Sequence, residues 1–436
     1  MRKYYLLMLF AILSWCVNGQ DKPVAFVGAL IYPIVGSPIE NGVIIVQKGK
    51  IIKVGGSDTA IPADAVVNNV PGKIIMPGLV DTHSHLGGPA GGDGSSPISP
   101  DTRVMDAVNP TSDGFMKALA GGLTTINIMP GSGHLMSGQT IYVKMREGKT
   151  IEDILITNEK GVFGGMKMAN GTNPMRATNA NGFPGTRAKS AALAREIFIK
   201  AIEYKKKIVR AGKDSTKLPE RDLKMEALLE VLSGKRVVHF HTHKENDILT
   251  AIRLSKEFGF RIVLQHVSEA WKVADEIAKA QVPCSIITID SPGGKLEAMN
   301  FSFSNGVALE RAGVLFGFHT DDGITDSRFL LRGAALMVKQ GLSRERAMEA
   351  LTIAGAKMMD MSSRVGSLEA GKDADLIVLS GDPFSVYTKV EQTWVEGKKR
   401  FDLSNPSDKA YAVGGYHVYR PERGEFHNHD DEGDDQ

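Results

Sequence analysis

The chain has 436 residues, of which 42% are hydrophobic and 23% are charged, and its formal net charge is +2. This length and composition are typical of a globular protein with one large domain and a smaller one. The small net charge gives no sign of a nucleic-acid or polyanion partner, so we expect a small-molecule ligand instead.

The first residues have the pattern of a signal peptide. Arg2 and Lys3 precede an apolar run over residues 6–15, and a small residue follows at Gly19. This pattern predicts a signal peptide over residues 1–19 and export to the periplasm or out of the cell. Lipoprotein anchoring through Cys16 is an alternative, although the bulky Trp15 beside it fits that motif poorly.

Two further features fit an exported, globular chain. Once residues 1–19 are removed, Cys284 is the only cysteine left, so no intrachain disulfide is expected. No later segment reaches the roughly 18 apolar residues that a membrane span requires. Nothing in the sequence decides whether the chain forms homo-oligomers.

Short, β-branched segments lie near both ends of the chain. They cover residues 24–34, 42–47 and 51–54 at one end, and residues 374–379 and 390–395 at the other. We therefore expect one composite β-sandwich domain made of residues 20–75 and 366–420. The tail, residues 421–436, is predicted to be disordered because its last twelve residues contain six acidic side chains and no basic one.

Strand-like and helix-like segments alternate between residues 76 and 365. This alternation predicts an α/β fold, and the length favours a (β/α)8 TIM-like barrel. A doubly wound sheet is the competing arrangement, but no Gly-X-Gly-X-X-Gly follows the first strand. A basic stretch over residues 205–217 has no aromatic platform, so we interpret it as a solvated insertion.

Polar side chains follow several of the apolar runs in this region. The first are His83 and His85, which end the run over residues 74–80. Alternate residues of a strand point to the same face, so both imidazoles would aim at one cation. Lys167 follows another run, and a desolvated lysine can react with CO₂ to give a carbamate, an oxygen ligand able to bridge two cations.

Three later strands end in similar residues. His239, His241 and His243 share one face of a strand, and His241 is the preferred ligand because three ligands from one strand are too far apart. His239 is either a ligand or a hydrogen-bonded core residue. His266 and Asp321 each end an apolar run, and a carboxylate there is costly unless it meets a cation or hydrogen-bond donors.

This order of residues resembles the metal-ligand plan of the amidohydrolase superfamily. The C-terminal segment 366–378 is similar to that superfamily's return into its β domain. A closer resemblance is to exported imidazolonepropionase-like amidohydrolases. It rests on the segments 129–133 and 137–139, on Met166 to Ala169 with Asn173 and Pro174, and on His241 to His243 with Asp247 and Ile248.

The resemblance implies a metal-dependent hydrolase that cleaves a C–N bond with a metal-activated hydroxide. His83, His85 and Asp321 would hold one metal, His241 and His266 would hold a second, and carbamylated Lys167 would bridge them. Zinc is the expected metal, and manganese or iron fit the same donors. Asp321 would accept a proton from water and pass it to the leaving nitrogen.

A mononuclear site is the alternative arrangement. It uses His83, His85, Asp321 and either His241 or His266, and it leaves Lys167 unmodified. The sequence does not decide between one and two metals.

The substrate is predicted less sharply. Arg187, His243 and the glycine-rich loop around Gly133 are candidates for binding a carboxylate, which suggests an N-acyl amino acid, a dipeptide or a lactam. Alternatively, Arg187 is a structural anchor for its loop, and the glycines are there to form turns. A deaminase, an esterase, or an exported metal-binding barrel without activity are the competing functions.

Overall fold

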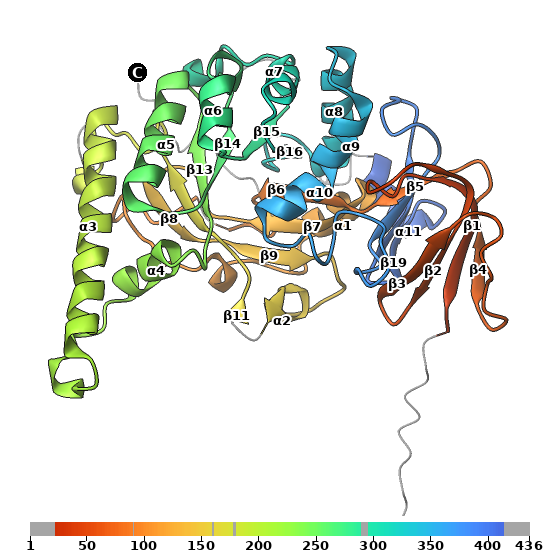
Figure 1. Cartoon of the computed structure of the whole chain (residues 1–436), viewed down its shortest axis with the longest axis horizontal. Helices are drawn as coiled ribbons and strands as arrows, with labels where there is room; N and C mark the ends of the chain where they lie inside the picture. Colours follow the sequence, from red (N-terminus) through yellow and green to blue (C-terminus); the bar gives the residue numbers. More distant parts are fainter. Residues whose placement is uncertain (1–21, 90, 159–160, 178–179, 289–294, 414–436) are drawn as a thin grey trace, which may run out of the picture.

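The computed structural model describes residues 22–413, apart from residues 90, 159–160, 178–179 and 289–294. The predicted signal peptide, Cys16 and the acidic tail therefore lie outside the described residues. The fold is mixed α/β, as expected, with a large helix-covered part beside a smaller sheet (Figure 1). No helix in the described ranges is long and apolar enough to cross a membrane.

The smaller sheet combines strands from both ends of the chain. Its order is β19-β18-β17-β5-β1-β2-β3, with β4 paired to β1. The contact between the two ends is the antiparallel pair of β17 and β5, in which Leu376 lies opposite Pro77. The strands are β1 (Val24–Ile31), β2 (Ile39–Gln47), β3 (Lys50–Gly55), β4 (Val66–Asn69), β5 (Ile74–Pro77), β17 (Leu376–Leu379), β18 (Val390–Val395) and β19 (Lys398–Asp402).

The central strands form two adjoining sheets. One has the order β16-β15-β14-β13-β12-β8 and the other the order β6-β7-β9. Their strands are β6 (Leu79–Ser84), β7 (Leu123–Ile128), β8 (Met136–Gln139), β9 (Ile141–Lys144), β12 (Met166–Ala169), β13 (Val238–Thr242), β14 (Ile262–His266), β15 (Cys284–Ile287) and β16 (Phe316–His319). A small separate pair is formed by β10 (Thr157–Asn158) and β11 (Gly161–Val162).

The eight-stranded barrel expected from the sequence does not appear as one continuous sheet in the described residues. Strands β12 to β16 are parallel, but β8 pairs with β12 and β9 pairs with β7 in the antiparallel direction. These two antiparallel strands interrupt the parallel ladder. The two sheets still meet where the amide of Asp321 donates to the carbonyl of His83, at 2.9 Å, and where Thr140 donates to Gly165, at 3.0 Å.

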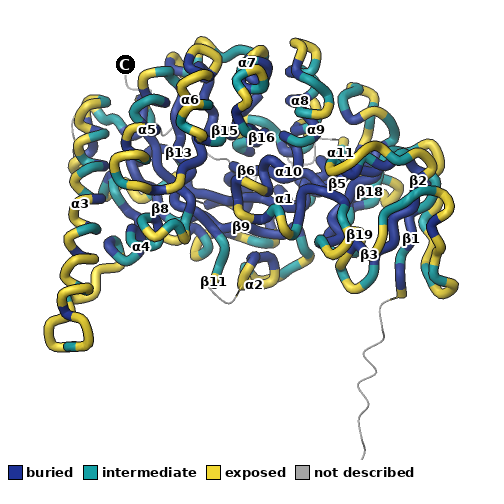
Figure 2. The backbone as a smooth tube through the Cα atoms, viewed as in Figure 1, coloured by how far each residue is buried: buried dark blue, intermediate teal, exposed yellow. Residues whose placement is uncertain are grey.

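Helices cover the central strands, whose residues are almost all buried (Figure 2). The described α-helices are α1 (Asp113–Ala120), α2 (Ile151–Ile154), α3 (Arg187–Ala211), α4 (Leu223–Leu232), α5 (Glu245–Phe258), α6 (Ala274–Ala280), α7 (Asn305–Arg311), α8 (Leu330–Lys339), α9 (Arg344–Leu351), α10 (Ile353–Met358) and α11 (Pro406–Val413). Short 3₁₀ turns occur at η1 (Val104–Asp106), η2 (Ala180–Gly182), η3 (Ser215–Lys217), η4 (Ala270–Lys272), η5 (Leu296–Ala298) and η6 (Ser327–Phe329).

The helix boundaries follow local chemistry. In α5 the buried residues recur at helical spacing, and the helix ends at Gly259, whose φ of +72° suits a residue without a side chain. Residues 270–280 form a 3₁₀ turn, η4, followed by α6, with Val273 between them. The far end of α3 projects from the body and is exposed, as expected for the basic insertion (Figure 2).

A buried ion-pair network joins the smaller sheet to the central strands. Lys144, at the end of β9, is fully buried and pairs with Asp373, at 3.0 Å, and with Asp375. Burial by itself would raise the pKa of Asp373, but Lys144, Lys50 and Arg364 outweigh it and lower that pKa to about 2. This network stabilises the junction between parts of the chain that are more than 200 residues apart.

Replacing Lys144 by methionine should destabilise the protein by about 3–5 kcal/mol, because two buried carboxylates lose their shared cation. Urea unfolding followed by circular dichroism at pH 7 measures this change. The matched control is Lys50→Met, which removes a half-exposed partner of the same Asp373 and should cost less than about 1 kcal/mol. Equal losses in the two variants would contradict the proposed role of burial.

The same variant should respond differently to acid. A carboxylate with a lowered pKa stabilises the fold above its ordinary pKa of 3.8, and this contribution disappears as the pH falls toward about 2. The stability difference between the parent and Lys144→Met should therefore shrink between pH 4 and pH 2. A difference that stays constant over this range would show that Asp373 is not the linked group.

Candidate metal centre

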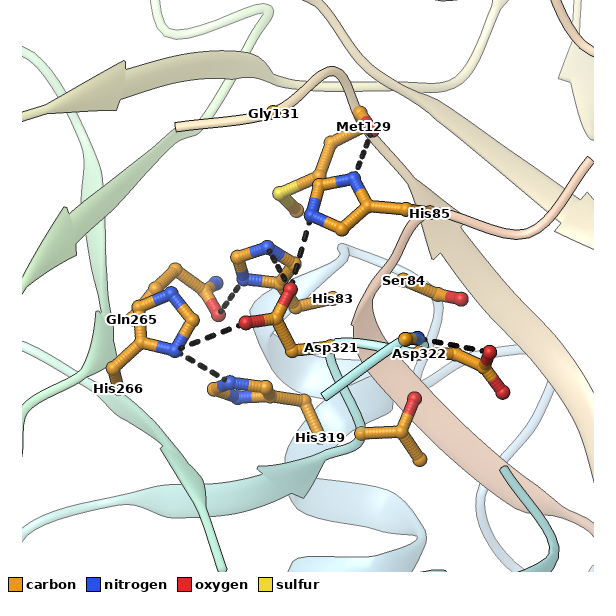
Figure 3. Close-up of polar contacts among 12 residues, drawn as sticks. His83, Ser84, His85, Met129, Gly131, Gln265, His266, His319, Asp321 and Asp322 are labelled. Atoms are coloured by element: carbon orange, nitrogen blue, oxygen red, sulfur yellow. Dashed lines mark hydrogen bonds and ion pairs between the residues drawn. The ribbon is translucent and has the colours of Figure 1, made fainter. Parts of the chain in front are cut away.

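Three of the predicted ligands converge at the ends of β6 and β16. The Nε2 atoms of His83 and His85 lie 3.4 Å and 3.0 Å from Oδ1 of Asp321. The backbone hydrogen bond from Asp321 to His83 holds the two strand ends together, so these side chains face one another (Figure 3). Two imidazole nitrogens and a carboxylate oxygen form a common donor set for a divalent transition metal.

Outer hydrogen bonds orient both imidazoles toward Asp321. Nδ1 of His85 lies 2.7 Å from the carbonyl oxygen of Met129, and Nδ1 of His83 lies 3.3 Å from Oε1 of Gln265 (Figure 3). Both partner atoms are carbonyl oxygens, which can only accept hydrogen bonds. In each of the two imidazoles Nδ1 therefore carries the proton and Nε2 keeps its lone pair. This is the tautomer that a metal ligand requires.

Lys167 lies against this first group. Its side chain is fully buried, and its Nζ is 3.0 Å from Nε2 of His83 and 3.2 Å from Sδ of Met129. The structure thus places the predicted lysine beside the histidine pair rather than at the surface.

A second group of imidazoles lies beside the first. The ring of His266 is 4.7 Å from the ring of His83 and 4.4 Å from that of His241, measured between centroids. Nε2 of His241 lies 3.9 Å from Oε1 of the buried Glu297. Among the described residues, four buried atoms here lack a hydrogen-bond partner: Nδ1 and Nε2 of His241, Nε2 of His266 and Oε1 of Glu297.

Unpartnered buried polar atoms of this kind are costly, and a cation would satisfy them. The residues present therefore fit the metal that the donor set indicates: nitrogen and oxygen ligands gathered in a buried, water-poor place. The donors suit zinc, and they also suit manganese or iron.

Two of the predicted ligands have left-handed backbones. The φ angle is +69° at His266 and +51° at Asp321, a region that costs residues with side chains about 1–3 kcal/mol. His266 leaves the extended conformation at its strand end, so it and its neighbour Gln265 both reach His83. Nδ1 of His266 also lies 3.1 Å from Nε2 of His319, which fixes its ring.

Burial sets the charge of these groups. It lowers the pKa of His83, His241 and His266 well below the usual value, so these imidazoles are neutral and able to bind a cation. Burial would raise the pKa of Asp321, but the positive charge of the nearby Lys167 is among the effects that outweigh it and hold that pKa well below its usual range. Asp321 is consequently the anion of the group.

The structure gives each predicted substrate-binding residue a defined partner. Nε of Arg187 is 2.8 Å from Oδ2 of Asp247, and Arg187 also lines a cavity of about 330 Å³ between α3 and α5. His243 is buried beside His241, and its Nδ1 is 2.8 Å from Oγ of Ser268. The carbonyl of Gly133 accepts a hydrogen bond from Arg176.

His239 lies deeper than the proposed ligands. Its Nδ1 accepts from Nε2 of Gln265, at 3.0 Å, and its Nε2 lies 2.9 Å from the hydroxyl of Tyr142. A buried hydrogen-bond chain therefore runs from Tyr142 through His239 and Gln265 to His83. Burial lowers the pKa of His239 to about 3, so it is a neutral member of this chain.

Sequence reasoning missed Gln265 and Glu297. Gln265 could have been found as a polar residue inside an otherwise apolar strand, directly before a predicted ligand. Glu297 gave no comparable signal because it lies on η5, in a loop that follows β15. Asp322, the residue after Asp321, has a structural role, since it accepts hydrogen bonds from the backbone of Gly323 and Ser327.

Comparisons with known proteins show what the chain as a whole is similar to. The profile of the amidohydrolase family matches residues 74–405. The amidohydrolase tasK of Hapsidospora irregularis is 28% identical over 90% of this chain, which spans only 45% of that longer protein. The imidazolonepropionase of Sphingopyxis alaskensis is 22% identical over 81% of this chain and 90% of its own length. A crystal structure of an amidohydrolase from Thermotoga maritima superposes with a TM-score of 0.81 and 33% identity over 87% of this chain and all of its own.

Replacing Gln265 by methionine, which has a similar shape but no amide, should weaken metal binding about 10- to 100-fold, because His83 loses the acceptor that fixes its tautomer. Competition with a chelating dye measures this affinity. The control is Gln340→Met, at the end of α8, which should leave metal affinity unchanged. Unchanged affinity in Gln265→Met would show that the hydrogen bond to His83 does not orient the ligand.

Proposed function

Because the chain belongs to the amidohydrolase family and is a metal-binding hydrolase of carbon–nitrogen bonds, we propose that it cleaves an amide, a lactam, an N-acyl amino acid or a dipeptide. The observation that carries the proposal is the convergence of His83, His85 and Asp321 at two adjoining strand ends. The signal-peptide pattern of residues 1–19 favours action in the periplasm or outside the cell.

In this proposal His83, His85 and Asp321 hold a divalent cation, with zinc as the metal that best suits the donors. A cation there supplies Lewis acidity and lowers the pKa of a water molecule toward neutrality. The burial of the surrounding imidazoles excludes bulk water, which strengthens every electrostatic contact with the substrate carbonyl.

Asp321 is the residue that moves the proton. Its carboxylate is ionised, so it can accept a proton from the attacking water and then donate it to the leaving nitrogen. The backbone hydrogen bond from its amide to His83 keeps the carboxylate beside the histidines during both transfers. Its left-handed backbone is held by the same contact.

A second cation is part of the proposal. His241 and His266 present buried, unpartnered nitrogen atoms next to the first group, and Lys167 lies at the edge of that group. Carbamylation would convert Lys167 into an anionic oxygen ligand between the two cations. With an unmodified Lys167, the site would hold one cation through His83, His85, Asp321 and one of the two later histidines.

The activity should depend on metal and on Asp321. The purified protein should hydrolyse members of a panel of amides, lactams, N-acetyl amino acids and dipeptides, and treatment with 1,10-phenanthroline should abolish this activity until zinc is added back. Asp321→Asn should lower kcat at least about 10³-fold, since it removes both the anionic ligand and the proton acceptor. Release of amine or amino acid provides the readout.

The same panel should include esters and cyclic amidines. Hydrolysis restricted to esters or amidines would replace the proposed reaction by that of an esterase or a deaminase. Absence of all hydrolysis in the zinc-loaded protein would favour an exported binding protein without activity.

Lys167→Ala should reduce the metal content from two ions to one per chain and lower activity, because the bridging ligand is lost. Metal analysis of protein prepared with added bicarbonate and zinc measures the stoichiometry. Lys279→Ala on the exposed side of α6 is the control. Full activity and unchanged metal content in Lys167→Ala would disprove the bridge and leave the single-cation arrangement.

A further inference from the structure

Two cationic side chains meet at Asn173 without a carboxylate partner. Nζ of Lys295 donates to Oδ1 of Asn173 at 2.6 Å, and Nη1 of Arg176 donates to the carbonyl oxygen of the same residue at 2.8 Å. Within the described ranges of the chain, neither cation has a carboxylate oxygen within 4.0 Å. Two like charges are thus held by one neutral residue.

Both cations lie on connecting segments that follow strands of the central sheet, Arg176 after β12 and Lys295 after β15. Asn173 follows β12, the strand of Lys167, and the neighbouring amide of Thr172 donates to Oε2 of Glu297 at 2.8 Å. Glu297 is two residues after Lys295, and its other carboxylate oxygen is 3.9 Å from Nε2 of His241. Glu297 therefore ties the Lys295 segment both to the loop after β12 and to the metal centre.

Arg176 is held in place entirely by neutral groups. Nη1 also donates to the carbonyl of Met175, at 3.0 Å, and Nη2 donates to the carbonyl of Gly133, at 3.2 Å. Its guanidinium lies 4.8 Å from the centroid of the Phe183 ring. The side chain is thereby fixed beside the glycine-rich loop, and no carboxylate of the described residues balances its positive charge.

Arg187, the residue that the sequence favoured for binding a carboxylate, differs in this respect. Its Nε contacts both carboxylate oxygens of Asp247, at 2.8 and 3.1 Å, and its Nη2 lies 3.6 Å from Glu297. Its charge is already balanced within the protein. An incoming anion would gain more from Lys295 and Arg176, whose present acceptors carry no charge.

The surface next to Lys295 is apolar. Leu296 is 83% exposed and Met299 is 71% exposed, and both lie within four residues of Lys295 on or beside η5. Exposed apolar residues next to uncompensated cations fit a ligand that combines an anionic group with an apolar side chain.

We propose that Lys295 and Arg176, set around Asn173, form the receptor for the substrate's carboxylate, and that the substrates are N-acyl amino acids or dipeptides ending in an apolar residue. This inference rests on the proposed function for its scissile bond. The receptor itself can be tested without any turnover.

The test compares two inert ligands of matched shape, 4-methylpentanoate and the neutral ketone 5-methylhexan-2-one, by calorimetry on the zinc-loaded full chain. The parent should bind the carboxylate more tightly than the ketone. Lys295→Gln and Arg176→Gln should each weaken carboxylate binding at least about 10-fold and leave ketone binding unchanged, because each removes one charge-assisted hydrogen bond.

Conservative and control variants separate recognition from folding. Lys295→Arg and Arg176→Lys retain the charge and should stay within about threefold of the parent, and Lys279→Gln on α6 should not differ from it. If Arg176→Gln fails to fold, Lys295→Gln carries the test alone, since that exposed side chain has a single neutral partner.

If the protein hydrolyses amides as proposed, steady-state kinetics provide a second readout. Lys295→Gln should raise KM for N-acetyl-leucine about 10-fold, and it should change neither KM for N-acetyl-leucinamide nor kcat for either substrate. Equal effects on the two substrates would overturn the receptor.

The outcomes also distinguish this inference from the proposed function. A carboxylate preference lost in Lys295→Gln supports the receptor even if the protein hydrolyses no amide. Carboxylate binding that is unaffected by Lys295→Gln overturns the receptor even if amides are hydrolysed, since the ligand would then be binding through the metal alone.

Discussion

The contact between the end of β6 and the segment after β16 is the constraint on which the candidate site depends. One backbone hydrogen bond, from the amide of Asp321 to the carbonyl of His83, joins the two central sheets and brings the carboxylate of Asp321 to the histidine pair. Asp81 strengthens the same junction by accepting from the amide and hydroxyl of Thr320. Little solvent reaches this junction: Asp81 is fully buried, and this burial raises its pKa to about 7. The fold and the site are therefore held by the same few contacts.

The protein bears a clear energetic cost at this place. Folding is opposed by the buried imidazole nitrogens that lack hydrogen-bond partners. It is also opposed by the left-handed backbone conformation of His266 and Asp321, which is unfavourable for residues with side chains. Such costs persist only where the surrounding structure holds the residues in place. Here the buried strands do so, together with the hydrogen bonds that link the polar side chains between them. Burial lowers the pKa of His83 and His241, so neutral nitrogen donors lie near an ionised carboxylate, and such a set of groups favours a divalent cation.

The sequence predicted the parts of this site that follow from strand periodicity. His83 lies on β6, His85 follows directly after it, and Asp321 follows β16, so alternation and apolar flanks were sufficient to find them. It could not predict partners that depend on tertiary placement. Arg187 meets Asp247 from a helix 60 residues away, a pairing that no local pattern encodes. The interruption of the parallel sheet by β8 and β9 could not be predicted for a similar reason. Their antiparallel directions are set by pairing with neighbouring strands, and a short apolar run looks the same in either direction.

In the proposed site, residues at strand ends bind the metal and residues on loops bind the substrate. The candidate metal ligands lie at strand ends, where backbone pairing fixes them, whereas Lys295 and Arg176 lie on connecting segments after β15 and β12. Strand ends change little when loops change length or sequence, so a family can retain its chemistry while loops alter the groups around it. Similarity to relatives therefore identifies the reaction class of this chain more firmly than its substrate. The substrate has to be inferred from charges that the loops leave uncompensated. In the described residues that criterion favours the cations around Asn173 over Arg187, which is already paired with a carboxylate.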